Sequence, residues 1–359
     1  MRWLYDASIS TRTEFSPQRL ASAGYARNRR KYKKRSANVM IFLGIDAGGS
    51  KTHALLVDEK GQVLGRGLGG NGNHQTAFEQ ARTSIDDACR QALQEAGATK
   101  EQVTFAYFGL AGADREPDYE ILRPMIASLD YKQYAIACDT MIGMRAGTNQ
   151  SYGAVIISGT GFNAAARNPQ GEELQYGGFG YLFGDGQGSG TDLAVHAFRS
   201  AIRASEGREQ ATLLSKLVPE RLGYATIQEM YDDALYNGKR PSHSLAKVMF
   251  EAASLGDAVA IRILREAGSE HANAVLALIK RLGMEQERFD VVLTGSVLSR
   301  GGSPHMVDAI QEALALAAPH AKTVRLTVDP VIGAVMSAMD CSGIAIGEAV
   351  DSALRKITF

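Results

Sequence analysis

An aspartate and a glycine-rich turn interrupt an apolar run between Ile41 and Asp58. The apolar residues that lead to Asp46 predict a strand, residues 48–52 predict a turn, and residues 53–57 predict a returning strand. Glycines at the tip of such a turn let backbone N–H groups approach a phosphate with no Cβ in the way. Because Asp46 stands at the base of the turn, where it could meet a metal ion, the run indicates nucleotide chemistry.

The same run departs from a P-loop in two ways. Gly44 and Gly49 have the P-loop spacing, but Ser50 occupies the position of the lysine, and a strand rather than a helix is expected next. Considered alone, the run is also compatible with an ordinary β-hairpin with a glycine turn. The motifs further along the chain favour the nucleotide interpretation.

The elements around this turn predict a mixed sheet. Short connections between the first three strands favour an antiparallel meander, and the first long helix is expected to end at Gly97. The predicted elements of the first half are strands at residues 41–45, 53–57, 63–67, 103–110 and 134–138, and helices at residues 76–96 and 118–128. Their order is β-β-β-α-β-α-β.

A second strand–turn–strand with a glycine tip begins more than 100 residues after the first. The predicted strands of this half are at residues 153–158, 162–167, 291–294 and 324–328, and a glycine-rich loop is predicted at 177–190. Residues 191–282 are predicted to be mainly helical, 305–317 a helix, and 332–354 mostly helix with glycine interruptions. The repetition predicts two related α/β domains that face each other across a cleft. We expect domains at 40–148 and 149–359, with residues 191–282 as a helical insert and the last helix packed on the first domain.

Composition places the chain among globular proteins. It has 359 residues, of which 45% are hydrophobic and 22% charged, and no apolar run approaches the roughly 20 residues of a membrane helix. The cysteines are few, widely spaced and without a CxxC pattern; they are Cys89, Cys138 and Cys341. This pattern argues against a disulfide framework or a zinc site, so we expect a cytoplasmic protein.

A net charge of zero conceals an uneven distribution. Residues 1–39 carry ten Lys or Arg and two acids, whereas the remainder has 29 basic and 37 acidic residues, a net charge of −8. We expect residues 1–39 to be a disordered basic leader, with Met40 as a candidate native start; an RNA- or membrane-binding arm is the alternative. The leader has no secretory apolar region.

Five short motifs together resemble the actin-like ATPase and sugar kinase superfamily. In chain order they are Asp46–Ser50, Gly109–Asp114, Cys138-Asp139, Ser158–Gly161 and Thr294–Val297. The chain is most similar to the N-acetylglucosamine kinases and their bacterial relatives in the BadF/BadG/BcrA/BcrD group, from about Met40 to the end. The most specific stretch is Ile157–Asn163, with the glycine-rich residues 168–171, 177–180 and 184–185 after it.

The resemblance implies an α/β fold of two actin-like (ribonuclease H-like) domains around a central cleft. It also implies ATP and Mg²⁺ as cofactors, with Asp46 holding Mg²⁺, usually through water. The nucleotide would be bound by two glycine hairpins and an adenosine-contacting turn, at Gly48, Gly49, Ser50, Lys51, Thr160, Gly161, Gly295 and Ser296. Ordinary turn chemistry for Asp46 and a helix N-cap for Ser296 are the structural alternatives.

Asp139 matches the catalytic base of that family. It follows a strand, so its carboxylate is expected at the edge of the cleft, where it can accept the proton of a sugar hydroxyl within about 3 Å. The alternative is a helix N-cap near Thr140. Asp114 also stands at a strand end, and we expect it to have a supporting role.

Sugar contacts carry over from the family to residues that suit hydroxyl groups, since Asn and Asp are short, directional hydrogen-bonding residues. They are Asn73, Asp139, Asn163, Gly178, Phe179, Gly180 and Asp185. Asn71 and His74 are secondary candidates, and plain loop chemistry is the alternative for the set. Phe179 replaces a tryptophan of the animal enzymes, which leaves the 2-substituent of the sugar open.

The expected function is ATP-dependent phosphorylation of the 6-hydroxyl of an amino sugar, foremost N-acetylglucosamine, by a homodimer without nucleic-acid or membrane partners. Glucosamine and N-acetylmuramic acid are alternative substrates. An ATPase activator of a 2-hydroxyacyl-CoA dehydratase is an alternative of another class, but Cys89 and Cys138 do not lie in the loops that an iron–sulfur cluster needs. A sugar-responsive repressor would need a helix-turn-helix module, for which residues 1–39 are too short and irregular.

Overall fold

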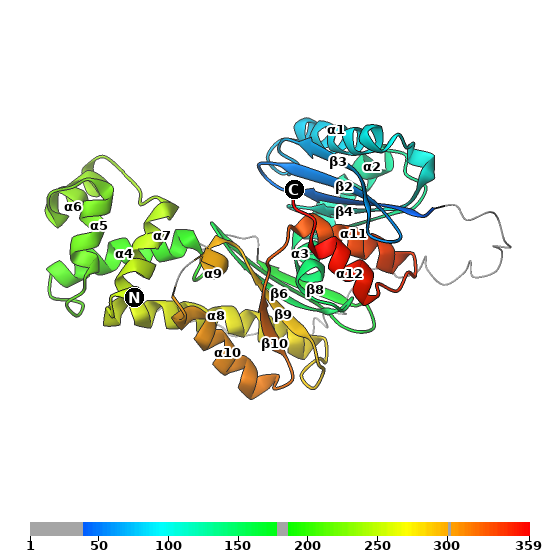
Figure 1. Ribbon diagram of the computed structural model, residues 1–359. Helices are drawn as coiled ribbons and strands as arrows, with labels where there is room; N and C mark the ends of the chain where they lie inside the picture. Colours follow the sequence, from blue (N-terminus) through cyan, green and yellow to red (C-terminus); the bar gives the residue numbers. More distant parts are fainter. Residues whose placement is uncertain (1–38, 178–185, 301–302) are drawn as a thin grey trace, which may run out of the picture. The chain divides into compact units, whose positions relative to one another are not determined.

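The protein contains two five-stranded sheets with one and the same topology. The computed structural model describes residues 39–177, 186–300 and 303–359 (Figure 1). The strand orders are β3-β2-β1-β4-β5 and β10-β9-β6-β7-β8, each with a three-stranded antiparallel meander followed by two parallel strands. The repetition expected from the two glycine turns is therefore a repetition of whole sheets.

The first sheet agrees with the predicted order of elements. Its strands are β1 (Ile41–Ala47), β2 (Thr52–Asp58), β3 (Val63–Gly69), β4 (Val103–Leu110) and β5 (Tyr134–Cys138). Its helices are α1 (Phe78–Ala96), α2 (Glu116–Ala127) and α3 (Asp139–Gly147), with a 3-10 turn at Lys100–Gln102. The predicted C-cap of α1 is confirmed, because Gly97 has a left-handed φ of 60° that favours glycine.

Helix α1 lies directly on β3. A Cβ on Gly67 would come within 1.8 Å of the carbonyl oxygen of Ala88, so only glycine allows this approach. Side chains of α1 also bond to the free edge of the strand: Gln91 accepts from the Leu68 N–H, and Glu95 accepts from the Arg66 N–H. The outer edge of the first sheet is thereby covered.

The second sheet consists of β6 (Gly153–Ser158), β7 (Phe162–Arg167), β8 (Glu173–Gly177), β9 (Asp290–Thr294) and β10 (Lys322–Arg325). Its helices are α4 (Gly190–Ser205), α5 (Leu214–Leu222), α6 (Ile227–Tyr236), α7 (Ala246–Ser254), α8 (Ala258–Arg281), α9 (Ser296–Arg300) and α10 (His305–Ala317), with a 3-10 turn at His243–Leu245. Within the described residues, no helix is long and apolar enough to cross a membrane.

Two strands of this half differ from the prediction. Strand β8 was not predicted, and the strand predicted at residues 324–328 is β10, which ends at Arg325 because Asp329 and Pro330 already begin the next helix. Residues 332–354, predicted to be mostly helix with glycine interruptions, form two helices, α11 (Pro330–Cys341) and α12 (Glu348–Arg355), in agreement with the prediction. The predicted leader at residues 1–39 lies, apart from Val39, outside the described residues.

Helix α11 packs against β1 and α3. A Cβ on Gly44 would lie 2.5 Å from the backbone nitrogen of Val335, and one on Gly333 would lie 1.9 Å from the carbonyl oxygen of Ile142. A single cluster of buried apolar side chains includes residues of both sheets, among them Val155. The two sheets are therefore not independent: a shared apolar core joins them through α3 and α11.

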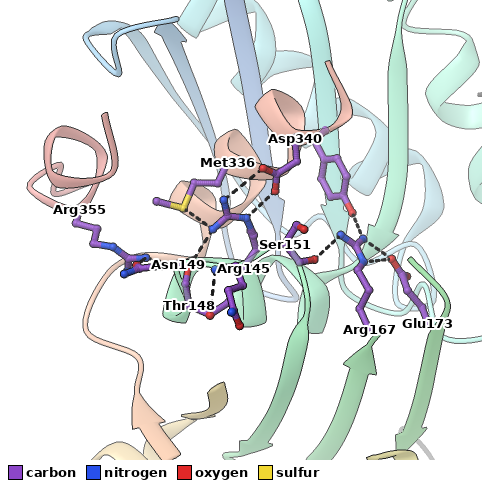
Figure 2. Close-up of polar contacts among 11 residues, drawn as sticks. Arg145, Thr148, Asn149, Ser151, Arg167, Glu173, Met336, Asp340 and Arg355 are labelled. Carbon is purple, nitrogen blue, oxygen red and sulfur yellow. Dashed lines mark hydrogen bonds and ion pairs between the residues drawn. The ribbon is translucent and has the colours of Figure 1, made fainter. Parts of the chain in front are cut away.

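Arginines hold the connection between the two sheets, which runs from α3 to β6 (Figure 2). Arg145, whose side chain is 3% exposed, donates to Asp340 of α11 at 2.6 Å and to the carbonyl of Thr148 at 3.0 Å. Arg355 of α12 donates to the carbonyl of Thr148 at 3.0 Å and to the side chain of Asn149 at 2.9 Å. Both C-terminal helices thus bond to this connection.

We predict that Arg145→Met destabilises the protein by roughly 3 kcal/mol, because it leaves the partly buried Asp340 carboxylate and the Thr148 carbonyl without their donor. Urea unfolding followed by circular dichroism measures the effect. Arg90→Met is the matched control, since Arg90 forms an exposed ion pair on α1 and its loss should change little. Equal stabilities of the two variants would contradict the role given to Arg145.

Candidate active site

The parallel strands β1, β4 and β5 end together at one edge of the first sheet. Ala47 of β1 lies opposite Leu110 of β4, which in turn lies opposite Cys138 of β5. Asp46 and Asp139 therefore stand at neighbouring strand ends, where ligands bind in open α/β sheets. The structure brings the predicted metal ligand and the predicted base together.

The electrostatics of Asp46 reflect these surroundings. Its pKa is raised from 3.8 to about 7, first by burial and then by the negative charges of Asp139 and Asp329, while the Lys51 ammonium opposes the shift. A carboxyl with such a pKa is partly protonated near neutral pH.

Asp139 is the first residue of α3, so it does not occupy the N-cap position that was the structural alternative. Burial raises its pKa, a hydrogen bond from the Cys138 thiol (Sγ to Oδ1, 3.2 Å) lowers it, and the charge of Asp114 raises it again. A raised pKa suits a general base, because the group must hold the proton that it accepts.

A glutamine of the second sheet reaches the acids of the first. Nε2 of Gln175, on β8, donates to Oδ1 of Asp114 at 2.5 Å, and its Oε1 accepts from the hydroxyl of Thr140 at 3.3 Å. Asp114 and Gln175 line a cavity of about 350 Å³, together with Arg115, Gly177, Glu270 and Asn273. A cavity of this size is at the lower end of the range for small-molecule sites.

The tip of the first hairpin is open. The Gly48 N–H donates to the carbonyl of Lys51 at 2.9 Å, which closes the turn, while Gly49 and Ser50 are exposed. A Cβ on Gly49 would meet no atom within 4 Å, so packing within the described residues does not require glycine there. A ligand that approaches the backbone would require it.

The second hairpin tip lies against the turn after β9. Gly295 has a φ of +86°, and a Cβ on it would lie 2.3 Å from the carbonyl oxygen of Ser158. A Cβ on Gly159 would lie 3.9 Å from the backbone nitrogen of Ser296. The structure thus brings Ser158 and Gly159, which lead into the predicted tip residues Thr160 and Gly161, next to the predicted turn at Gly295 and Ser296.

The N-terminus of α4 also contacts this hairpin. The N–H of Gly190 donates to the carbonyl of Gly159 at 2.7 Å, and the hydroxyl of Thr191 donates to the carbonyl of Thr160 at 2.9 Å. These bonds fix the hairpin from its second side. Gly161, for which an added Cβ would meet nothing within 4 Å, remains open.

The predicted sugar contacts differ in how they are placed. Oδ1 of Asn163, on β7, is buried and has no hydrogen-bond partner among the residues that the structure describes, which is unfavourable unless a donor is supplied from elsewhere, such as a ligand. Oδ1 of Asn73 instead accepts from the N–H of Gln75 at 2.9 Å, as in an ordinary Asx turn. The predicted contacts at Gly178, Phe179, Gly180 and Asp185 lie outside the described residues.

The two secondary candidates brace the loop that carries Asn73. Oδ1 of Asn71 accepts from the Asn73 N–H at 2.9 Å, and Nε2 of His74 lies 3.3 Å from Oδ1 of Asp118 on α2. A Cβ on Gly112 would lie 2.9 Å from Oδ1 of Asn73, so this loop adjoins the one that leads to Asp114.

Sequence reasoning missed Asp329 and Gln175. The Asp-Pro pair at the start of α11 is a helix-start signal, but only the packing of α11 on β1 brings the Asp329 charge near Asp46. Gln175 lies on the strand that was not predicted. No local signal distinguishes it from other polar residues, because its partners are 61 and 35 positions away in the chain.

Comparison with known proteins agrees with this geometry. Residues 43–338 match the model of the BadF/BadG/BcrA/BcrD ATPase family. An "N-acetylmuramic acid/N-acetylglucosamine kinase" of Clostridium acetobutylicum is 29% identical over 300 residues, which cover 82% of this chain and 97% of the relative. An "N-acetyl-D-glucosamine kinase" of Dictyostelium discoideum is 29% identical over 316 residues, which cover 84% and 98%.

Among solved structures, a putative N-acetylglucosamine kinase from Chromobacterium violaceum is similar in fold. Its TM-score is 0.61 at 22% sequence identity, and the match covers 83% of this chain and 99% of that one. The two-sheet α/β fold expected from the motifs is therefore confirmed. Since the family model spans most of the chain, the protein belongs to the BadF/BadG/BcrA/BcrD ATPase family.

Proposed function

We propose that the protein transfers the γ-phosphoryl group of ATP to the 6-hydroxyl of an amino sugar, foremost N-acetylglucosamine. The observation that carries the proposal is the pair of acids at adjacent strand ends: Asp46, with a pKa of about 7, and Asp139, whose pKa is also raised. Two relatives named as kinases of N-acetylglucosamine, each matching more than four fifths of the chain, support the substrate class.

Asp139 is the proposed general base. As the bond between the sugar oxygen and phosphorus forms, its carboxylate accepts the hydroxyl proton, which a base of this kind accelerates by about 10²–10⁴. Burial and the nearby Asp114 favour the protonated product of that step, while the Cys138 thiol keeps the carboxylate available as an acceptor beforehand. Because phosphoryl transfer has a loose transition state, positioning supplies most of the remaining acceleration.

Asp46 is the proposed ligand of Mg²⁺, through water. Within the described residues, no three or more His, Cys, Asp or Glu side chains form a group that could hold a metal, which suits an ion held largely by water and phosphate. The surroundings of Asp46 suit a cation in charge, since after burial the negative charges of Asp139 and Asp329 are what raise its pKa. A bound Mg²⁺ would neutralise charge on the phosphates.

The two glycine hairpins are proposed to bind the phosphates of ATP. The first tip, residues 48–51, would offer the N–H groups of Gly49, Ser50 and Lys51, while the N–H of Gly48 closes the turn. The second tip would bind through Thr160 and Gly161, and the Gly295-Ser296 turn beside it would contact the adenosine. Asn163 is the proposed sugar contact, since its buried carbonyl oxygen needs a hydroxyl or amide donor.

No observation favours the dehydratase activator. Such a protein needs cysteines that reach a cluster at a subunit interface. Cys89 is 0% exposed on α1, and Cys138 is 2% exposed with its thiol hydrogen-bonded to Asp139. Neither side chain is available for a shared cluster.

The direct test is ATP consumption by the purified protein with N-acetylglucosamine, glucosamine, N-acetylmuramic acid and glucose. We predict that Asp139→Asn lowers kcat on the preferred amino sugar by about 10²–10⁴ while circular dichroism remains unchanged. Asp87→Asn, at an exposed site on α1, is the control that should keep its activity. Near-normal turnover by Asp139→Asn would exclude it as the base, and activity on glucose alone would refute the substrate class.

Asp46 gives a second test, in metal-free buffer. Its folded-state pKa of about 7 lies above the ordinary 3.8, so the folded protein binds the proton more tightly, and stability is lost as the pH rises from about 4 through about 7. Asp46→Asn cannot titrate, so its stability relative to the wild type should increase across this range. Urea unfolding in EDTA at several pH values measures it, and a constant difference would contradict the pKa given to Asp46.

The orphaned oxygen of Asn163 gives a third test. Asn163→Leu keeps the size of the side chain but removes the acceptor, so we predict a KM for the sugar at least about tenfold higher, the loss of one ligand hydrogen bond. The KM for ATP should remain close to that of the wild type. A change in both constants, or in neither, would argue against a sugar contact.

A further inference from the structure

One side chain of the second sheet bonds to the acid cluster of the first sheet on two sides. Gln175 donates to Oδ1 of Asp114 at 2.5 Å and accepts from the hydroxyl of Thr140 at 3.3 Å. Thr140 directly follows Asp139 in the chain and is fully buried. Gln175 thus holds both residues that flank the proposed base in space.

The thiol of Cys138 lies near the carboxylates of both Asp114 and Asp139. The thiol of Cys138 lies 3.2 Å from Oδ1 of Asp139 and 3.5 Å from Oδ1 of Asp114, and a thiol has only one proton to donate. The amide of Gln175 bonds to the same Oδ1 atom of Asp114. Because Asp114 has this stronger donor, the thiol proton is left for Asp139.

We propose that Gln175 is a positioning residue for phosphoryl transfer, which acts on Asp139 through Asp114 and Cys138. This inference rests on the proposed function. Without the Gln175 amide, Asp114 competes for the thiol. Asp139 then loses its hydrogen bond from the Cys138 side chain, and among the described residues only backbone N–H groups remain to orient its carboxylate. The loss of this hydrogen bond should slow the chemical step and leave nucleotide binding unchanged.

The location of Gln175 favours a role in the reaction over a purely structural one. It is only partly buried and lines the 350 Å³ cavity together with Asp114, so it faces space that a ligand can enter. Gln175 also lies on β8, and the last residue of this strand, Gly177, is paired with Asn163 of β7. The side chain therefore connects the strand next to the proposed sugar contact with the proposed base.

The test is a double-mutant cycle in kcat. Gln175→Met keeps the length of the side chain and removes both polar groups, and we expect kcat on the amino sugar to fall roughly 10- to 100-fold, as for a slightly misplaced catalytic group, with little change in the KM for ATP. Gln175→Glu places a second carboxylate beside Asp114 and should reduce kcat further. Gln170→Met, at an exposed turn, is the matched control and should have wild-type kcat.

The cycle partner is Asp114→Asn, which removes the competing charge. If Gln175 acts through Asp114, adding Gln175→Met to Asp114→Asn should cost little further activity. Equal losses in both backgrounds, or a folded Gln175→Met variant with wild-type kcat, would overturn the inference and leave the proposed function standing. A wild-type protein that phosphorylates no amino sugar would overturn both.

Discussion

The site depends on one constraint: three parallel strands end in register, and the chain places carboxylates at those ends. Asp46 and Asp139 are brought close enough to raise the pKa of Asp46, and Asp114 adds its charge to that of Asp139. Like charges at this distance are unfavourable unless they are compensated. Lys51, the N-terminus of α3 and the Cys138 thiol compensate this repulsion in part. The repulsion that is not compensated favours the binding of a cation or a proton.

The repeated sheet explains how a second set of groups reaches these acids. Each sheet begins with a glycine hairpin, and the second hairpin is fixed by the Gly295 turn and by the first residues of α4. The connection between the sheets is bonded to α11 and α12 through Arg145 and Arg355. Rigid supports on both sides are what a phosphoryl-transfer enzyme requires, since most of its acceleration comes from positioning.

Local pattern was sufficient for the elements near the glycine turns. The meander, the strand at 103–110 and the C-cap at Gly97 were predicted because alternating apolar residues and glycine punctuation act within a few positions. Strand β8 was missed although Leu174 and Tyr176 alternate with polar residues, because it has only five residues and runs directly into the glycine-rich loop. The glycine interruption predicted within residues 332–354 was found at Gly343, whose φ is +74°.

The acids at positions 46 and 139 could be predicted because they stand at the ends of apolar strands and match motifs of the sugar kinase family. The contributions of Asp329 and Gln175 could not, since both depend on how distant segments pack. The central claim is that both hairpins bind one triphosphate next to a sugar held by Asp139. A crystal structure with Mg²⁺, a non-hydrolysable ATP analogue and N-acetylglucosamine tests it directly. We predict residues 48–51 and 160–161 on the same triphosphate and the Asp139 carboxylate in hydrogen-bonding contact with the sugar O6. A nucleotide bound by only one hairpin, or a sugar O6 directed away from Asp139, would contradict the account.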